Sequence, residues 1–374
     1  MTTATLDLNS SAERTGPGER LPRLFSTCLL RPRSLPPSQP DMEVIGVFNP
    51  GAVATENGVV LLVRVAERTR EERRGYTALP RWDFETGNIV SDWHRDNEVC
   101  PVDIRVVKHK ESGRVRLNFT SHLRVVFSHD GKQIDSIDGA TLRPENIYEE
   151  YGIEDPRLTR IGEVYYITYV AVSRHGVATA LASTRDFKSF ARHGIIFPPE
   201  NKDVVLFPEK IRGEYYALHR PSAATPFTRP EMWIARSPDL THWGRHEQFL
   251  GGHETWDTGR IGAGTPPIRT PEGWLEIYHG NGKREEDAGI GTYSGGLLLL
   301  DLEDPRKIIA RRGAVIVPET DYEREGFVPN VIFPTGVVEQ DGRLLVYYGG
   351  ADTFTGVVEF SMRDVLEFLR PTGR

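Results

Sequence analysis

The chain has 374 residues, of which 38% are hydrophobic, and a formal net charge of −7 without a run of lysine and arginine. This charge balance argues against a nucleic-acid surface or an anionic membrane as its partner. The two cysteines, Cys28 and Cys100, are too few for a disulfide framework or a zinc site.

The first 40 residues are expected to form a tail and a lead-in outside the folded domain. Residues 1–22 have the polar composition of a disordered tail, and Pro32, Pro36, Pro37 and Pro40 favour an extended segment. The tail has no apolar core like that of a secretion signal, and no stretch approaches the roughly 20 apolar residues that span a bilayer. We therefore expect a cytoplasmic protein. The polar tail and lead-in are long enough to reach a neighbouring subunit, which leaves a homo-oligomer open.

Residues 41–374 are expected to form one domain of repeated β-strands. A polar turn that ends in glycine, followed by a short aromatic or β-branched strand, recurs about every 50 to 70 residues, which indicates a propeller or a solenoid. Helical periodicity is nearly absent before Met362–Leu369, where we expect a short closing helix. The clear copies of the repeat are Gly58–Arg64, Gly162–Tyr169, Gly213–Arg220, Gly273–His279 and Gly342–Tyr348, and a faint sixth copy is Gly113–Phe119.

Polar residues cluster before most of these strands or at their ends. The innermost strand of each propeller blade begins near the central axis, so we expect the clusters to face one another across a funnel. Carboxylates, amides and aromatic rings suit a sugar, and cleavage of a glycosidic bond requires a proton that a carboxyl group usually supplies. The candidate residues are Asn49, Arg64, Asp155, Arg157, Asn201, Lys202, Asp203, His219, Arg220, Arg260, His279, Tyr293 and Asp352.

Several arginines in this set need a second explanation, because a neutral sugar does not require them. Arg220 and Arg260, helped by Lys202 or His279, would hold an inorganic phosphate, whose oxygens fit the guanidinium fork. The alternative is that each arginine pairs with a neighbouring acid. The histidines lie far apart in the sequence without ligand spacing, so we expect no metal, and we expect no cofactor besides phosphate as a co-substrate.

The motifs around these residues resemble glycoside hydrolase family 130, which contains β-mannoside phosphorylases and some β-mannosidases. The resemblance runs in order from about Val47 to Thr353. It implies a five-bladed β-propeller, with the faint repeat as a divergent blade or an insertion. It also implies inverting phosphorolysis of β-mannosides to α-mannose 1-phosphate and a shortened sugar. The matching stretches are Gly152–Thr159, Asn201–Ile211, Leu218–Pro221, Ile261–Gly264, Tyr278–Gly280, Tyr293–Gly295 and Tyr348–Thr353.

The resemblance also implies roles for single residues. Asp155 is similar to the general acid, whose proton is thought to travel through the 3-hydroxyl of the mannosyl unit, and Asp103 is the second choice. Arg220 and Arg260 resemble phosphate ligands, and Lys202 is expected to take a third basic position. The residues that resemble the grip on the mannosyl unit are Asn49, Arg64, Asn201, Asp203, His219 and Asp352.

Two other functions stay open at this stage. An inverting β-mannosidase on the same fold would need a second carboxylate to activate water, for which Glu200 and Asp257 are the candidates. A glycan-binding propeller without activity would have no use for Asp155 and the paired arginines. The choice between β-1,4 and β-1,2 linkages and the sugar in the leaving position depend on loops 69–76 and 283–291, whose sequences do not indicate a preference.

Overall fold

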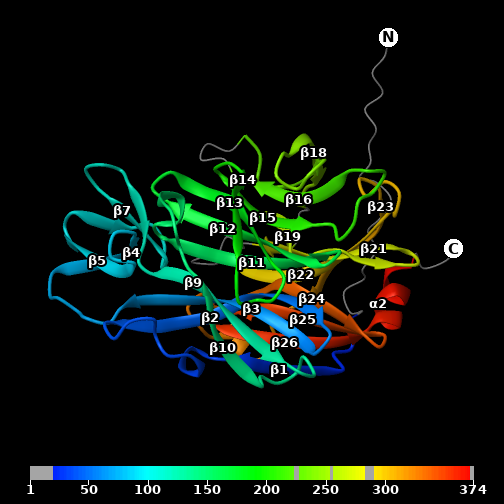
Figure 1. Cartoon of the computed structure of the whole chain (residues 1–374), viewed down its shortest axis with the longest axis horizontal. Coiled ribbons are helices and arrows are strands. Elements are labelled where there is room, and N and C mark those ends of the chain that lie inside the picture. Colours follow the sequence, from blue (N-terminus) through cyan, green and yellow to red (C-terminus); the bar gives the residue numbers. More distant parts are fainter. Residues whose placement is uncertain (1–19, 223–226, 253–255, 283–289, 371–374) are drawn as a thin grey trace, which may run out of the picture.

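The computed structural model describes residues 20–222, 227–252, 256–282 and 290–370, and within them the fold is all-β (Figure 1). The predicted tail, residues 1–19, lies outside the described residues, as do residues 283–289 of one loop expected to influence substrate choice. No helix in the described part of the chain is long and apolar enough to cross a membrane.

Five antiparallel sheets, each with four strands in its main path, build the body of the described chain. The first contains β2 (Met42–Thr55), β3 (Gly58–Thr69), β9 (Thr120–Ser128) and β10 (Ser136–Leu142). The second contains β11 (Gly152–Ile161), β12 (Val164–Ser173), β13 (Gly176–Thr184) and β14 (Ala191–Phe197). The third contains β15 (Asn201–Leu206), β16 (Tyr215–Pro221), β17 (Met232–Ser237) and β18 (Gly244–Leu250).

The last two sheets follow the same plan. The fourth contains β19 (Arg260–Ala263), β21 (Gly273–Gly282), β22 (Thr292–Leu300) and β23 (Ile308–Ile316), with β20 (Ile268–Thr270) beside β21. The fifth contains β24 (Ile332–Gln340), β25 (Arg343–Gly350), β26 (Phe354–Ser361) and β1 (Phe25–Leu30). The short helices are η1 (Pro32–Ser34), η2 (Ile147–Glu149), α1 (Asp321–Arg324) and α2 (Met362–Leu369).

The expectation that residues 1–40 lie outside the folded domain is wrong, because strand β1 is part of the fifth sheet. It pairs antiparallel with β26, with Ser26 opposite Val358, and the two strands run together along one edge of the molecule (Figure 1). The segment lacks the glycine turn that precedes the repeated strands, and its partner lies at the other end of the chain. A pattern that is local in sequence therefore cannot reveal this pairing.

Each sheet packs on the next through its own apolar cluster, and the fifth packs on the first. The first strands of the sheets also lie close together: β2 contacts β11 and β24, and β15 contacts β11 and β19. Burial of these apolar faces is the main force that holds the sheets together. Buried pairs across the five successive junctions are Leu62 with Ile153, Leu181 with Ala217, Leu218 with Trp274, Ile277 with Val346, and Leu61 with Tyr347.

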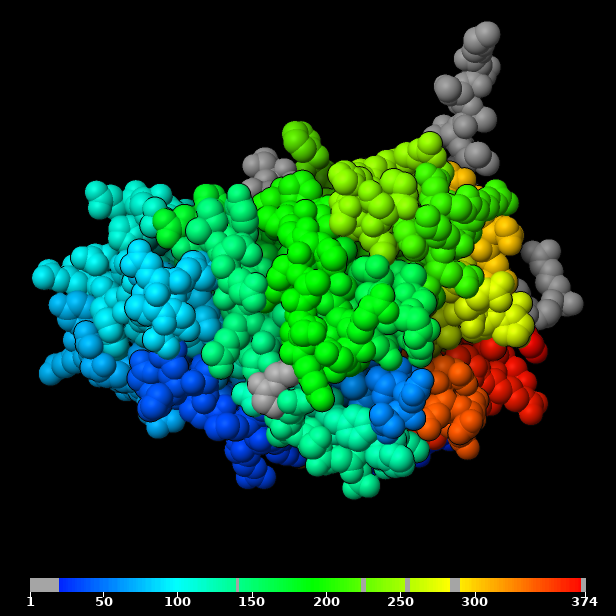
Figure 2. Space-filling model, viewed as in Figure 1, coloured from blue at the N-terminus to red at the C-terminus, as the bar shows by residue number. Residues whose placement is uncertain are grey.

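Residues between β3 and β9 form an insertion that makes a lobe at one end of the molecule (cyan in Figures 1 and 2). Its strands form a sheet of two and a sheet of three. The faint repeat at Gly113 belongs here, because β8 follows it and pairs with β7. The insertion consists of β4 (Tyr76–Asp83), β5 (Asn88–Arg95), β6 (Val99–Pro101), β7 (Val106–His109) and β8 (Val115–Leu117).

Candidate active site

A cavity of about 410 Å³ receives side chains from the first strands of several sheets and from the insertion. Its wall combines carboxylates and cations with aromatic and aliphatic side chains, as sugar sites do. Most of the residues proposed from sequence line it: Asn49, Arg64, Asp155, Lys202, Asp203, Arg220, Arg260, Tyr293 and Asp352.

Three of these residues occupy the same local position on three different sheets. Asn49, Asp155 and Asp203 lie at irregularities in the pairing of β2, β11 and β15 with their neighbours. Their φ angles are 50°, 50° and 58°, in the left-handed region that asparagine and aspartate tolerate better than most residues. A bulge of this kind redirects a side chain. The repeated bulge thus explains why three strands each present an amide or a carboxylate to the cavity.

The carboxylate of Asp155 is buried and hydrogen-bonded on one oxygen. Its Oδ1 accepts from Asn49 Nδ2 at 2.7 Å and from Arg64 Nη1 at 2.9 Å. Arg157 donates through Nη1 to the main-chain oxygen of Asp155 at 2.8 Å. Burial by itself would raise the pKa of Asp155, but the charges of Arg64 and Arg157 and the amide of Asn49 outweigh it and lower the pKa. Asp155 is therefore ionised in the free protein.

Arg64 is fixed from several sides. Its Nη2 donates to Glu154 Oε1 at 2.6 Å and its Nε donates to Ser121 Oγ at 3.1 Å. The guanidinium carbon lies 4.7 Å from the ring centre of Phe48 and 5.5 Å from that of Phe119. These contacts hold the planar cation in one orientation, so Arg64 fixes the position of the Asp155 carboxylate.

Asp203 contacts a second set of basic side chains. Its Oδ2 accepts from Arg220 Nε at 2.8 Å and lies 2.6 Å from Arg220 Nη2. Arg157 Nη2 is 3.4 Å from its Oδ1, and His279 Nε2 is 3.4 Å from its Oδ2. Burial opposes ionisation of Asp203, but Arg220 and His279 hold its pKa well below the usual range. Asp203 therefore offsets much of the charge of Arg220, as the alternative interpretation of the arginines expected.

Lys202 and Arg260 differ from Arg220, because their side chains form no ion pair or hydrogen bond with any described residue. Both line the cavity. Lys202 lies opposite Arg220 in the pairing of β15 with β16. The pKa of Lys202 is lowered, mainly because the side chain is buried. A bound anion would relieve the cost of burying such a cation. Two cations without a described ion-pair partner therefore line the same cavity as Asp155.

Four proposed site residues lie behind the cavity wall instead of lining it: Arg157, Asn201, His219 and His279. His279 is fully buried beside Asp203, so the expectation that it binds phosphate is wrong. Asn201 Nδ2 lies 3.0 Å from His219 Nδ1. Burial and the neighbouring His246 lower the pKa of His219 to about 3, which keeps it neutral. Asn201 and His219 therefore link β15 and β16 behind the cavity.

Arg105, in the insertion, also lines the cavity, although it was not predicted from sequence as a site residue. Its Nη2 is 3.0 Å from Asp103 Oδ2 and its Nη1 is 3.9 Å from Asp352 Oδ2. Asp103, the second choice for the acid, does not line the cavity. The sequence did show a polar cluster before the faint repeat, but Asp103 was chosen from it as the candidate instead of Arg105.

The two carboxylates considered for a hydrolase lie in different environments. Glu200 lines the cavity, and its Oε1 accepts from the main-chain nitrogen of Val177 at 3.2 Å. Asp257 is buried, and its Oδ2 accepts from Arg311 Nη2 at 2.6 Å. Asp257 does not reach the cavity, so Glu200 is the only one of the two that can meet a substrate there.

Comparison with known proteins identifies the family. The family model of glycoside hydrolase family 130, described as beta-1,4-mannooligosaccharide phosphorylase, matches residues 108–371. A beta-1,2-mannobiose phosphorylase from Listeria innocua is 39% identical, over 91% of this chain and 96% of that protein. A beta-1,4-mannooligosaccharide phosphorylase from Ruminococcus albus is 37% identical, over 58% of this chain and 64% of that protein.

Comparison with solved structures identifies the same family. The solved structure of the Listeria innocua enzyme in complex with beta-1,2-mannobiose superposes with a TM-score of 0.85 at 38% identity. The superposition covers 91% of this chain and 96% of that chain. The family match contains the second, third and fourth sheets entirely and all of the fifth sheet except β1. The relatives extend the similarity over nearly all of the described chain. This chain therefore belongs to glycoside hydrolase family 130.

Proposed function

We propose that this protein is an inverting β-mannoside phosphorylase, which cleaves a β-mannoside with inorganic phosphate to α-mannose 1-phosphate and a shortened sugar. The observation that carries the proposal is the pair of cations without partners, Lys202 and Arg260, in the same cavity as the buried carboxylate Asp155. A hydrolase or a passive glycan-binding protein has no need to keep such cations unpaired. The named activities of the relatives support the same reaction.

In the proposed reaction, Arg260, Lys202 and Arg220 hold phosphate on the face of the sugar opposite the leaving oxygen. A phosphate oxygen forms a bond to the anomeric carbon as the glycosidic bond breaks, which inverts the configuration. Hydrogen phosphate gives up one proton and the leaving hydroxyl gains one, so the overall reaction needs no further acid. The mannosyl unit would contact Asn49, Asp203, Tyr293 and Asp352.

Asp155 must gain a proton before it can act as the acid, because it is ionised in the free protein. We propose that bound phosphate causes Asp155 to take up this proton. A phosphate anion next to Lys202 and Arg260 adds negative charge close to Asp155, and a like charge raises the pKa of a carboxylate. The proton then passes to the leaving oxygen through the 3-hydroxyl of the mannosyl unit.

We also propose the linkage that is cleaved, the arrangement of the five sheets and the place of the reaction in the cell. The linkage is β-1,2, supported by the 39% identity with the beta-1,2-mannobiose phosphorylase over 91% of this chain. The five sheets are the blades of a five-bladed propeller, supported by the apolar cluster between each sheet and the next. The reaction takes place in the cytoplasm, where a charged sugar phosphate is retained.

A panel of β-mannobioses with and without phosphate tests this function. We expect β-1,2-mannobiose to be consumed faster than β-1,4-mannobiose, and only when phosphate is present. Rapid cleavage without phosphate would instead support a mannosidase that uses Glu200. Binding without cleavage under either condition would support the glycan-binding alternative.

A further inference from the structure

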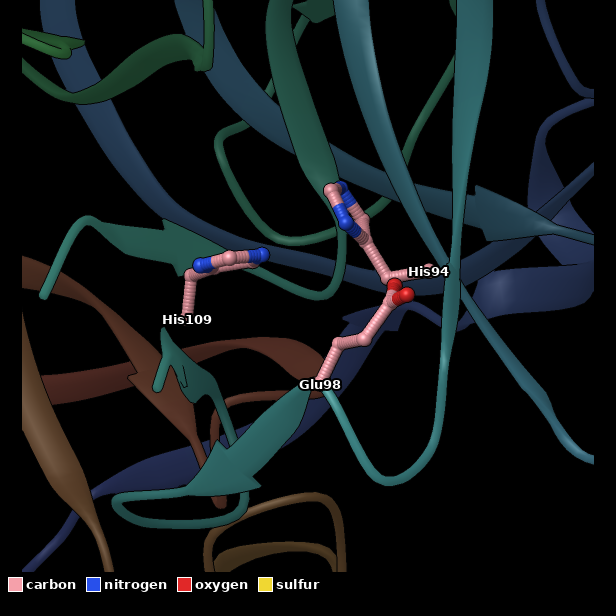
Figure 3. A group of neighbouring side chains, drawn as sticks. All are labelled: His94, Glu98 and His109. Atoms are coloured by element: carbon pink, nitrogen blue, oxygen red, sulfur yellow. The ribbon is translucent and has the colours of Figure 1, made fainter. Parts of the chain in front are cut away.

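A second group of chemically active side chains lies in the insertion, outside the cavity. His94 is on β5, Glu98 precedes β6, and His109 ends β7. One potential ligand atom from each residue lies within 4.8 Å of the other two. Figure 3 shows the three side chains, which come from neighbouring segments of the two small sheets. The sequence gave no sign of this group, because the separations of its members match no known metal motif.

Main-chain hydrogen bonds fix the three positions. Val99 lies opposite His109 in the pairing of β6 with β7, and the nitrogen of Lys110 donates to the oxygen of Glu98 at 2.9 Å. The nitrogen of Glu98 donates to the oxygen of Arg95 at 2.8 Å, which closes the turn from β5. The arrangement is therefore built into the backbone, as a binding site requires.

Each of the three side chains offers an atom that could bind a metal ion. Nε2 of His94 is buried and has no hydrogen-bond partner among the described residues, which is a costly state for an imidazole nitrogen. Nδ1 of His109 lies 3.2 Å from Ser112 Oγ. Nδ1 also accepts from the main-chain nitrogen of Ser112 at 3.3 Å, so the ring proton of neutral His109 is on Nε2. A metal ion bound at Nε2 would replace this proton. Glu98 forms no ion pair within the described ranges, and its Oε2 accepts from the main-chain nitrogen of Arg95 at 3.0 Å.

We propose that His94, Glu98 and His109 bind a divalent transition-metal ion, with zinc as the first choice. Two imidazoles and one carboxylate are donors that zinc uses, and three protein ligands leave a position for water. Calcium and magnesium prefer sites made mostly of oxygen. The two imidazole rings lie 5.6 Å apart between centres at an interplanar angle of 71°, so they do not stack on each other.

The ion would connect the two small sheets of the insertion. β5 belongs to the sheet of two strands, and β6 and β7 belong to the sheet of three. Arg105, Val115 and Arg116 of the insertion line the active-site cavity. A metal at this position would therefore stiffen the part of the wall that the insertion supplies, without a role in bond cleavage.

Zinc binding to the untagged full-length protein tests the proposal. After chelator treatment and dialysis, zinc chloride is titrated by calorimetry, and bound zinc is counted by elemental analysis. We expect one zinc ion per chain and a higher melting temperature with zinc. Glu98→Gln, His94→Ala and His109→Ala should each weaken binding at least tenfold, since loss of even outer-shell partners costs about 10- to 100-fold.

His242→Ala is the matched control, because His242 is exposed and pairs with Asp239 away from the insertion. It should bind zinc like the unaltered protein. Glu98 is exposed, so Glu98→Gln should fold even if a histidine variant does not. Absence of zinc binding, or equal affinity in the unaltered protein and Glu98→Gln, would overturn the proposal.

Discussion

Arg64 and Asp155 lie on different sheets and form a buried ion pair, with 2.9 Å between Nη1 and Oδ1. Asn49, on the same sheet as Arg64, adds a hydrogen bond of 2.7 Å to the same carboxylate oxygen. The first two sheets therefore hold the proposed acid together, and the other carboxylate oxygen remains to meet a substrate. The distance between these residues in the sequence shows how strongly the site depends on the packing of sheets.

We predict that Asp155→Asn lowers kcat at least about 100-fold, which is the low end of the usual contribution of a general acid. The fold should persist, because asparagine tolerates the φ of 50° at this position and keeps an oxygen for Arg64 and Asn49. Initial rates with β-mannobiose and phosphate, together with a melting curve, measure both effects.

Asp103→Asn is the matched control for that variant. It removes the other candidate acid, which pairs with Arg105 and does not line the cavity. Its kcat should stay within a few-fold of the unaltered protein. A variant at residue 155 that turned over normally, or a larger loss at residue 103, would show that the acid has been assigned wrongly.

We predict that Arg260→Ala raises the KM for phosphate about 10- to 100-fold, the loss expected for a hydrogen bond to a charged group. The KM for the mannoside should change much less. Arg260 is a cleaner target than Arg220, whose loss would also leave the buried carboxylate of Asp203 without its closest partner. Steady-state kinetics with each substrate varied in turn give both constants.

Arg269→Ala provides the comparison, because this arginine is exposed and pairs with Glu209 at 3.2 Å. Neither KM should change in this variant. Equal effects of Arg260→Ala on the two KM values would speak against a phosphate site at Lys202 and Arg260.

Much of this site could be predicted from sequence, because polar residues recur at equivalent points of a repeated strand. Asn49, Asp155 and Asp203 share one bulge, and a residue that tolerates a positive φ is required at each. His279 was misplaced, because a repeat shows that a residue ends a strand but does not show which neighbour covers it. Residue 279 lies beneath Asp203 and does not reach the cavity.

Contacts between segments far apart in the sequence account for the remaining differences between the predicted and the observed structure. β1 joins a sheet whose other strands lie at the far end of the chain, and no local pattern records that. Arg105 reaches the cavity only because the insertion folds into its own small sheets. The separations between His94, Glu98 and His109 likewise match no metal motif, although the turn and the pairing of β6 with β7 bring them together.

The buried carboxyl group of Glu276 should make the stability of the fold depend on pH. It is fully buried, its Oε1 accepts from the nitrogen of Gly264 at 3.0 Å, and its Oε2 has no described partner. Burial raises its pKa to about 8 from the ordinary 4.5. The folded state therefore holds a proton that the unfolded state has lost between these pH values, so stability falls as pH rises through this window.

The expected loss is about 1.4 kcal/mol of unfolding free energy per pH unit between about pH 4.5 and 8. Glu276→Gln should lack this contribution, so its stability relative to the unaltered protein should increase from pH 5.5 to pH 7.5. Urea unfolding at several pH values measures it, with the exposed Glu163→Gln as the control. Parallel curves for the unaltered protein and Glu276→Gln would contradict the account.

Asp352 predicts a dependence of mannoside binding on pH. Burial raises its pKa to about 6, despite the opposing charges of Arg105 and Arg64. If the ionised carboxylate accepts hydrogen bonds from sugar hydroxyls, binding weakens as the group takes up a proton. A group with this pKa loses about nine-tenths of its ionised form between pH 7 and pH 5, so the mannoside KM should rise about tenfold.

Kinetics at saturating phosphate across this range measure the effect. Asp352→Asn should have a higher mannoside KM at pH 7 and a much weaker dependence on pH. The same pH profile in the variant would show that another group controls binding.

The most direct test follows the fate of the anomeric carbon by NMR when the protein acts on β-1,2-mannobiose in phosphate buffer. We predict one α-mannose 1-phosphate for each glycosidic bond broken, and no turnover when phosphate is replaced by a buffer without it. Release of free mannose at the same rate in both buffers would contradict a phosphate nucleophile held by Lys202, Arg220 and Arg260.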